Sequence, residues 1–291
     1  MKKIILRIIG IIFFLFSIGL AGYPFISNYL NSLNSKSEVV QYLETVENSS
    51  SSFADMKKAA DEYNKGLIES GVIISDPFSD STTENLEYEN LLKFERTSVM
   101  VGLEIPTLDI NLPVYHGTSE TVLKKGVGHL SSSSLPIGGK GTHAVLTGHT
   151  GLSSQKLFTD LDKVSYNDIF FINVFNEKLA YKVDNIAVVT PDDTSLLQID
   201  GTKDYVTLIT CTPYGINTHR LLVRGVRIPY EEAKDIINLT NSDNNSTWVE
   251  EYTSAIILGI SVMLGILIIY VFIRLIIYFI RKRKNNEKQE S

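Results

Sequence analysis

The sequence predicts a mainly β domain, either a barrel or a sandwich, with a helical region before it and a membrane segment on each side. Between residues 99 and 227, short runs rich in β-branched and aromatic residues alternate with Gly, Pro, Asn and Asp. Several short strands at this spacing indicate a barrel or a sandwich. A long apolar run lies near each end of the chain, with basic residues on the side of the chain terminus, as in membrane segments.

The first apolar run covers residues 4–20 and is interrupted only by Arg7 and Ser17. Basic residues before an apolar run are typical of a signal peptide or a signal anchor. Ala21 and Gly22 form only a weak cleavage site, so we predict an uncleaved membrane anchor over residues 1–24.

The second apolar run, residues 255–273, contains 19 residues without a charge. As a helix it is about 28 Å long, which matches the hydrocarbon thickness of a bilayer. Residues 281–284 are all basic. We predict a transmembrane helix within residues 254–280 and a basic cytoplasmic tail over 281–291. By the positive-inside rule both termini are cytoplasmic, and residues from about 25 to 250 face outward at the cell membrane.

The region 25–94 is predicted to be helical around a loop. Residues 35–70 have helical apolar spacing with a serine-rich break at 49–52, which predicts two helices. Residues 71–87 are polar and contain Asp76-Pro77-Phe78, and Pro77 biases Asp76 to extended geometry, so this stretch is expected to be a loop.

The β region is predicted to contain seven strands and one short helix at residues 157–161. A polar linker over 232–253 leads to the second membrane segment. The predicted strands cover residues 99–105, 112–115, 143–147, 169–174, 178–189, 205–211 and 221–227.

Charge and cysteine content restrict the function. The net charge of -6 argues against a nucleic-acid partner, which needs a basic face. Cys211 is the only cysteine, so the chain forms no internal disulfide and no thiolate metal cluster. A lone cysteine is either a small buried hydrophobe or a reactive thiol. We expect no metal and no cofactor.

The strand at 205–211 ends on Cys211, and Pro213-Tyr214-Gly215 turns the chain directly afterwards. A side chain at the end of a barrel strand is held rigidly and faces solvent, which suits a nucleophile. An antiparallel hairpin here brings Arg220 close to Cys211. Its guanidinium is suited to stabilise a thiolate, hold a substrate carbonyl or stabilise an oxyanion.

The acid–base partner is one of five histidines. His149 ranks first because it lies in a glycine-flanked loop after a predicted strand, where backbone and substrate approach closely. His219 ranks lower because it points to the face of its strand opposite Arg220. The others are His116, His129 and His143.

These motifs resemble the sortase family. Residues 207–225 are similar to its signature around the catalytic Cys and Arg, and residues 143–151 to the segment that carries its catalytic His. Residues 105–106, 112–118 and 126–130 resemble earlier sortase strands and loops. The resemblance spans about residues 70–230. It implies a closed sortase β-barrel with short helices over residues 95–231, with Cys211, His149 and Arg220 as its catalytic residues.

Two features resemble class C, the pilin-polymerising branch. One is the second membrane helix, and the other is Asp76-Pro77-Phe78, which is similar to a lid motif. The resemblance implies that Asp76 pairs with Arg220 and that Phe78 covers Cys211. An exposed ion pair contributes about 0–1 kcal/mol and a buried aromatic about 1.5–3 kcal/mol, so Phe78 is expected to hold the lid more strongly.

The resemblance further implies a two-step acyl transfer. Cys211 attacks the Thr–Gly carbonyl of an LPXTG-like sorting signal, His149 protonates the departing amine, and a Lys amine of a second pilin subunit resolves the thioester. The alternatives are a housekeeping sortase that attaches proteins to peptidoglycan, a hydrolytic cysteine protease, and a non-enzymatic surface protein tethered to the membrane.

Overall fold

The computed structural model describes residues 2–48, 53–71, 74–78, 86–152 and 154–241, together with seven isolated positions between 259 and 274. The chain divides into two compact units, Met1–Ile236 and Ile237–Ser291. The isolated positions are helical. Most of the predicted membrane segment 254–280, the second half of the predicted linker and the basic tail 281–291 lie outside the described residues.

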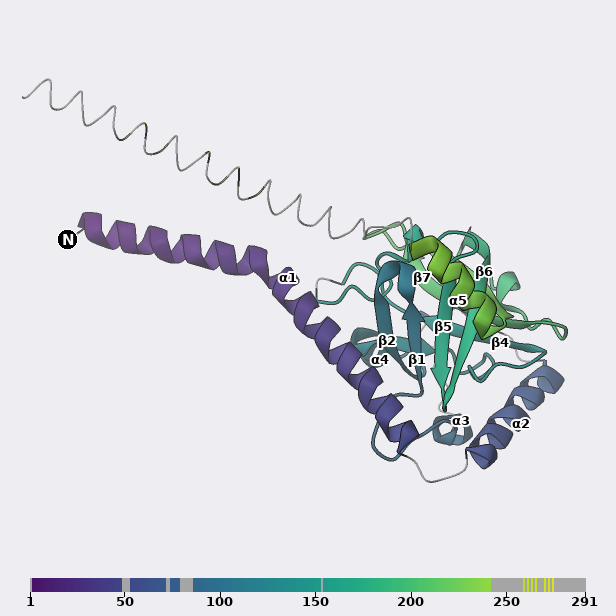
Figure 1. Cartoon of the computed structure of the whole chain (residues 1–291). Coiled ribbons are helices and arrows are strands. Elements are labelled where there is room, and N and C mark those ends of the chain that lie inside the picture. Colours follow the sequence, from purple (N-terminus) through teal and green to yellow (C-terminus); the bar gives the residue numbers. More distant parts are fainter. Residues whose placement is uncertain are drawn as a thin grey trace, which may run out of the picture. The chain divides into compact units, whose positions relative to one another are not determined.

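The first unit contains a closed eight-stranded barrel, which confirms the predicted mainly β class and the closed barrel that the family resemblance implies (Figure 1). Its strands follow the order β1-β2-β3-β4-β7-β8-β6-β5 around the barrel. Their bounds are β1 Val101–Ile105, β2 Ile110–His116, β3 Val127–His129, β4 Thr142–Thr147, β5 Ile169–Val174, β6 Glu177–Val189, β7 Asp204–Thr212 and β8 His219–Ile228.

Strand β7 lies between β4, to which it is parallel, and β8, to which it is antiparallel. Because side chains alternate across a strand, Val206 and Leu208 enter the main core while Ile209 lies in a second apolar cluster. Cys211 is two residues after Ile209 and therefore shares its face of the sheet.

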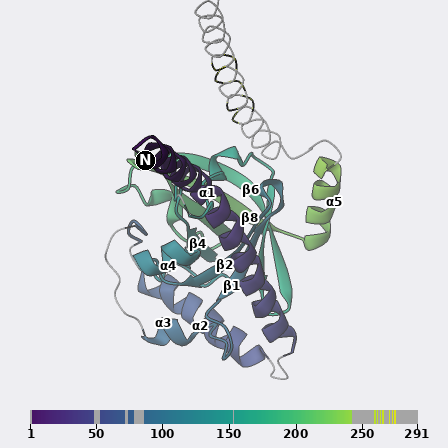
Figure 2. The same cartoon turned by 90° about the vertical axis from the view of Figure 1, so that its left-hand side faces the viewer.

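Helix α1, Lys2–Glu47, joins the predicted anchor and the first predicted helix in one element. Its later part packs on β1 and β2 through buried Val39, Tyr42 and Val46 (Figure 2). The helix bends by 42° between Ile12–Leu20 and Gly22–Glu47. Pro24 explains the bend, because its ring clashes with the carbonyl four residues earlier.

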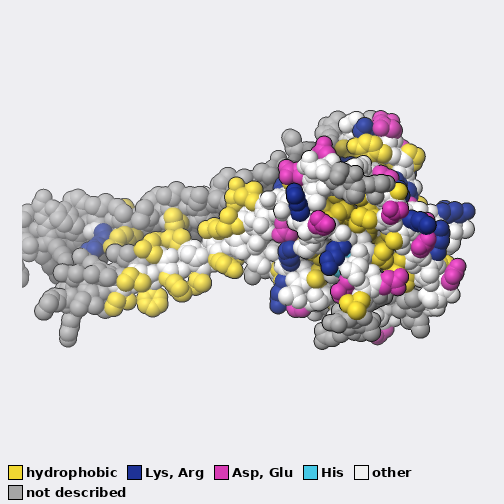
Figure 3. Space-filling model, turned by 90° about the horizontal axis from the view of Figure 1, so that it is seen from below, with side chains coloured by type: hydrophobic (Ala, Val, Ile, Leu, Met, Phe, Trp, Pro, Cys, Tyr) yellow, Lys and Arg dark blue, Asp and Glu magenta, His cyan; other side chains and the backbone are white. Residues whose placement is uncertain are grey.

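The early part of α1 exposes large apolar side chains, which Figure 3 shows along its projecting length. Within the described residues, no single helix has both the length and the apolar content to cross a membrane. The bent pair Ile12–Leu20 with Gly22–Glu47 meets both criteria together.

The other helices are short. Helix α2, Ala54–Ser70, matches the second predicted helix and ends at Gly71, whose φ of 60° is left-handed as in many helix C-caps. Helix α5 occupies the first half of the predicted linker. The remaining bounds are α3 Leu86–Asn90, α4 Glu120–Lys125, α5 Tyr230–Asn241 and the 3-10 turns Pro106–Leu108, Leu161–Lys163 and Ser195–Leu197.

One local prediction is wrong, and one strand is missing from the predicted set. Residues 157–160 form turns instead of a helix, because Leu157 has a left-handed φ of 38° and the Phe158 side chain is buried in the core. Strand β3 was not among the predicted strands, because it has three residues and its middle residue is Gly128, a poor strand former.

Gly128 is required by packing. A Cβ atom there would lie 2.4 Å from the Gly117 carbonyl oxygen and 3.0 Å from Leu123. We expect Gly128→Ala to lower the free energy of unfolding by about 1–3 kcal/mol, as other overpacking substitutions do. Urea denaturation of the full-length chain measures it. Gly201→Ala is the control, because a Cβ at Gly201 meets nothing within 4 Å, and equal stability of the two variants would contradict the packing argument.

Candidate active site

The hairpin of β7 and β8 places Cys211 and Arg220 directly opposite each other. Directly opposed residues of antiparallel strands project to the same face, with Cβ atoms about 4.5–5.5 Å apart. Cys211 is partly buried, and the Arg220 side chain is 12% exposed. The predicted hairpin therefore exists, and it holds a guanidinium beside the thiol.

The loop after β4 brings His149 to the same end of the barrel. Thr147 pairs with Ile209 in the parallel ladder, and the Gly148 N–H donates to the Ile209 carbonyl at 3.0 Å. The Thr210 hydroxyl donates to the Gly148 carbonyl at 2.8 Å. These bonds fix the backbone of the residue before His149 against the two residues that precede Cys211.

Two other histidines are structural. His129 and His143 are fully buried, and burial lowers their pKa values to about 3 and about 4. Both ring nitrogens of each histidine have a hydrogen-bond partner. His129 contacts Tyr88 and the Ser134 carbonyl, and His143 contacts Thr207 and the Gln198 carbonyl. Both rings are neutral at physiological pH, and their nitrogens already make hydrogen bonds inside the protein.

The remaining two histidines do not face the thiol. Burial lowers the pKa of His116, and its Nε2 lies 2.6 Å from the Leu91 carbonyl oxygen. His219 is opposite Thr212 in the ladder, so it lies on the other face from Arg220, as expected, and its Nδ1 is 2.9 Å from the Thr218 hydroxyl. His149 remains as the acid–base candidate of this site.

Residues 74–78, called the lid segment below, cover this end of the barrel. The Asp76 carboxylate accepts two hydrogen bonds from Arg220, from Nε at 2.9 Å and from Nη2 at 2.7 Å. The Asp76 side chain is 15% exposed. The expected exposed ion pair is therefore largely buried, and removing one partner leaves the other charge desolvated and unpaired.

Phe78 lies between the two basic candidates. Its ring centroid is 5.7 Å from that of His149, and the Arg220 guanidinium carbon is 5.0 Å from the Phe78 centroid. The Phe78 ring therefore packs against both the imidazole and the guanidinium. Pro77 forms the turn between Asp76 and Phe78.

Ile74 anchors the lid segment, a role that the sequence interpretation missed. It is 3% exposed and belongs to the second apolar cluster, together with outward-facing Val145, Ile209 and Leu222. The signal in the sequence was one apolar outward-facing residue on each of these three strands, at two positions from Cys211 on β7 and at two positions from Arg220 on β8. An exterior barrel face this apolar requires a cover.

The surroundings of the partly buried thiol favour its neutral form. Burial raises the pKa of Cys211, Arg220 opposes the shift, and Asp76 adds to it. No hydrogen bond joins the Cys211 sulfur to His149 in this arrangement. Among the residues that the structure describes, no three His, Cys, Asp or Glu side chains are grouped to hold a metal ion.

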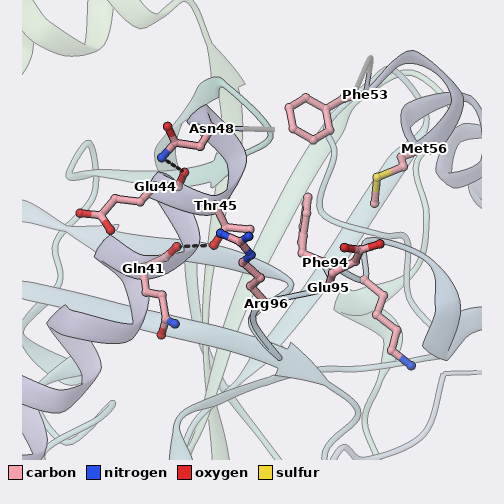
Figure 4. Close-up of a pocket in the computed structure, with 10 residues that line it drawn as sticks. Gln41, Glu44, Thr45, Asn48, Phe53, Met56, Phe94, Glu95 and Arg96 are labelled. Atoms are coloured by element: carbon pink, nitrogen blue, oxygen red, sulfur yellow. Dashed lines mark hydrogen bonds between the residues drawn. The ribbon is translucent and has the colours of Figure 1, made fainter. Parts of the chain in front are cut away.

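A separate groove lies between α1, α2 and residues 93–96 (Figure 4). Its apolar wall consists of Phe53, Met56 and Phe94. Of its polar rim, Thr45 and Asn48 bond to carbonyl oxygens within α1, at 2.7 Å and 2.8 Å. The groove shares no lining residue with the site at Cys211.

The sequence and the fold match known proteins. The family model described as "Sortase domain" matches residues 103–228. Among curated relatives, Sortase A of Streptococcus agalactiae is 28% identical over 139 residues, and Sortase A of Bacillus anthracis is 29% identical over 131. These matches cover 45% of this chain but only 56% and 60% of the relatives, less than two thirds of their length.

Solved structures match more completely. Sortase C-1 of Streptococcus pneumoniae is 44% identical, with a TM-score of 0.62 over 67% of this chain and 99% of that chain. Sortase C-1 of Actinomyces oris is 42% identical, with a TM-score of 0.58 over 61% and 99%. A pilus-related sortase C of Group B Streptococcus is 38% identical, with a TM-score of 0.59 over 65% and 96%.

Opening of the lid segment should expose the thiol and change its chemistry. We expect Asp76→Ala plus Phe78→Ala to raise the alkylation rate of Cys211 by a small thiol reagent about tenfold, which corresponds to about 1.4 kcal/mol of lost closure. Since burial and Asp76 both raise the pKa of Cys211, the midpoint of the rate–pH profile should also move to lower pH.

The measurement compares the wild-type chain, both single variants and the double variant across pH. Asp184→Ala is the matched control, because Asp184 forms a similar two-bond pair with Arg224 on the same strand as Arg220, at 3.0 Å and 2.9 Å. Identical profiles in the wild-type, single and double variants would show that the lid segment does not limit access to Cys211.

Proposed function

The chain belongs to the sortase family, and from this premise we propose that it is a class C cysteine transpeptidase that polymerises pilins. The observation that carries the proposal is the placement of Cys211 and Arg220 as cross-strand neighbours beside the His149 loop, under Asp76 and Phe78. The sortase C structures support the branch, because they match over nearly their whole length at 38–44% identity.

In the first step, the Cys211 thiolate attacks the Thr–Gly carbonyl of an LPXTG-like sorting signal. Arg220 donates to the substrate carbonyl and the developing oxyanion, which its fork of donors suits better than a point charge. His149, as imidazolium, protonates the departing glycine amine while the C–N bond breaks. A thioester between Cys211 and the Thr carbonyl remains.

In the second step, a Lys side-chain amine of another pilin subunit attacks the thioester. The C–S bond breaks, an isopeptide bond forms, and His149 takes up the amine proton, which restores the Cys211 thiolate and the His149 imidazolium with which the first step began. Since water competes with the amine, transfer depends on how well the acceptor is positioned.

The proposed location is the cell membrane, with both termini in the cytoplasm and the barrel outside. The apolar early part of α1 and the uncharged run at 255–273 support two membrane segments. The basic residues Lys2, Lys3 and Arg7 and the run at 281–284 support their cytoplasmic ends.

A housekeeping sortase that anchors proteins to peptidoglycan is the second candidate. Curated relatives named Sortase A favour it, at 28–29% identity over about half of this chain. The higher identity to sortase C structures and the lid segment favour pilin polymerisation. Purified chain mixed with a pilin discriminates the two, since only a polymerase forms a ladder of covalent multimers.

The nucleophile is tested with Cys211→Ala. We expect complete loss of thioester capture and of pilin ladders, with unchanged folding, because the substitution removes a sulfur atom and little volume. Electrophoresis of pilin incubated with the full-length chain, or produced in a strain without other sortases, measures the loss. Ladders formed by Cys211→Ala would refute the enzymatic proposal.

The role of Arg220 is tested with two substitutions. If directed donors hold the substrate carbonyl, Arg220→Lys loses nearly as much kcat/KM as Arg220→Ala, about a hundredfold or more, as when an oxyanion donor is removed. A peptide-cleavage assay measures both. Activity of Arg220→Lys within a few-fold of wild type would mean that only the positive charge matters.

A further inference from the structure

His149 has a carboxylate neighbour that the proposed mechanism does not yet use. The Glu120 Oε2 atom lies 3.4 Å from His149 Nε2. The His149 side chain is 19% exposed, and its Nε2 atom is buried without a hydrogen bond. A buried polar atom without a partner costs about 1–3 kcal/mol, so a small rotation of Glu120 that completes this contact is favourable.

The short helix α4 holds Glu120 in place. Ser119 caps this helix by accepting a hydrogen bond from the Val122 N–H at 3.4 Å, and Glu120 is its first residue. Helix α4 leads directly into β3, which pairs with β4, the strand that precedes His149. The two side chains therefore meet through adjacent elements of the barrel.

The two carboxylate oxygens of Glu120 have different neighbours. Oε1 lies 3.1 Å from the Lys124 ammonium one helical turn away, and Oε2 faces His149. Lys124 lowers the pKa of Glu120, with a further contribution from His149, so the group is ionised at physiological pH. Since 61% of the Glu120 side chain is exposed, it has room to adjust when His149 moves.

The other charged groups near the imidazole are already engaged. Arg220, on the far side of Phe78, is bonded to Asp76, and Cys211 lies opposite Arg220 on β7. Among the described residues, Glu120 is the ion-pair partner of His149. A carboxylate at one ring nitrogen determines which tautomer the neutral ring adopts and stabilises its cationic form.

We propose that Glu120 is a positioning residue for His149, whose carboxylate holds the proton of Nε2 and directs Nδ1 to the proton transfers at Cys211. The expected change in kcat rests on the proposed function. The expected change in the tautomer of the His149 ring does not, because it is measured without a substrate. The competing explanation is a purely structural one, in which Glu120 only pairs with Lys124 to stabilise α4.

The kinetic test uses Glu120→Gln and the matched control Lys124→Gln, which breaks the same helical pair and leaves the carboxylate at His149. The assay uses the full-length chain with an LPXTG-type peptide. We expect Glu120→Gln to lower kcat about fivefold, which corresponds to the loss of an ion pair worth about 1 kcal/mol, and to change KM by less than about twofold. Glu120→Asp should recover part of the loss, and Lys124→Gln should match wild type within twofold.

The second test needs no substrate. Nitrogen NMR of histidine-labelled chain, with His149→Asn for assignment, identifies the protonated nitrogen of the neutral His149 ring. We expect the proton on Nε2 in wild type and Lys124→Gln, and a mixture of both tautomers in Glu120→Ala. Equal tautomer ratios in Glu120→Ala and wild type would overturn the proposal.

The outcomes separate the two proposals. Wild-type chain that forms no thioester with the peptide refutes the proposed function, while the NMR comparison still decides the role of Glu120. An active wild type with unchanged Glu120→Gln kinetics overturns the inference alone. Equal losses in Glu120→Gln and Lys124→Gln assign Glu120 to the stability of α4 and also overturn it.

Discussion

The hydrogen-bond register of β7 with its two neighbours determines where every reactive side chain lies. The antiparallel register with β8 sets Cys211 opposite Arg220, and the parallel register with β4 sets the Gly148 backbone against Ile209. A shift of one residue in the β7–β8 ladder would send Cys211 and Arg220 to opposite faces. The buried hydroxyl bond from Thr210 to the Gly148 carbonyl adds a side-chain contact to the same register.

Arg220 has one set of directed donors, and the lid segment already uses two of them. Asp76 takes Nε and Nη2, while Nη1 donates to the carbonyls of Asn217 and His219 in the turn. A substrate carbonyl that binds the same donors has to displace the Asp76 carboxylate. Substrate affinity in the proposed function is therefore reduced by the free energy that keeps the lid segment closed.

The closed arrangement also covers an apolar exterior surface. Val145, Ile209 and Leu222 face outward from three adjacent strands, and Ile74 and Phe78 pack on them. Exposing this surface costs free energy through the hydrophobic effect, in addition to the cost of separating the ion pair. The lid segment thus has a polar attachment through Asp76 and apolar attachments through Phe78 and Ile74, and the sequence motif indicated all of these except Ile74.

The sequence by itself determined the β class, most strands, the two separate helices within residues 35–70 and the identity of the site candidates, because alternation, glycine and proline are local signals. The catalytic roles of Cys211, His149 and Arg220 stay predictions until the variants are measured. Only the tertiary structure decided that Gly128 lies in a strand, that the Asp76 pair is buried, and that Ile74 and Glu120 adjoin the site. The physical reason is distance along the chain: Asp76 and Arg220 are 144 residues apart, and no local sequence pattern shows which surfaces the folded chain brings together.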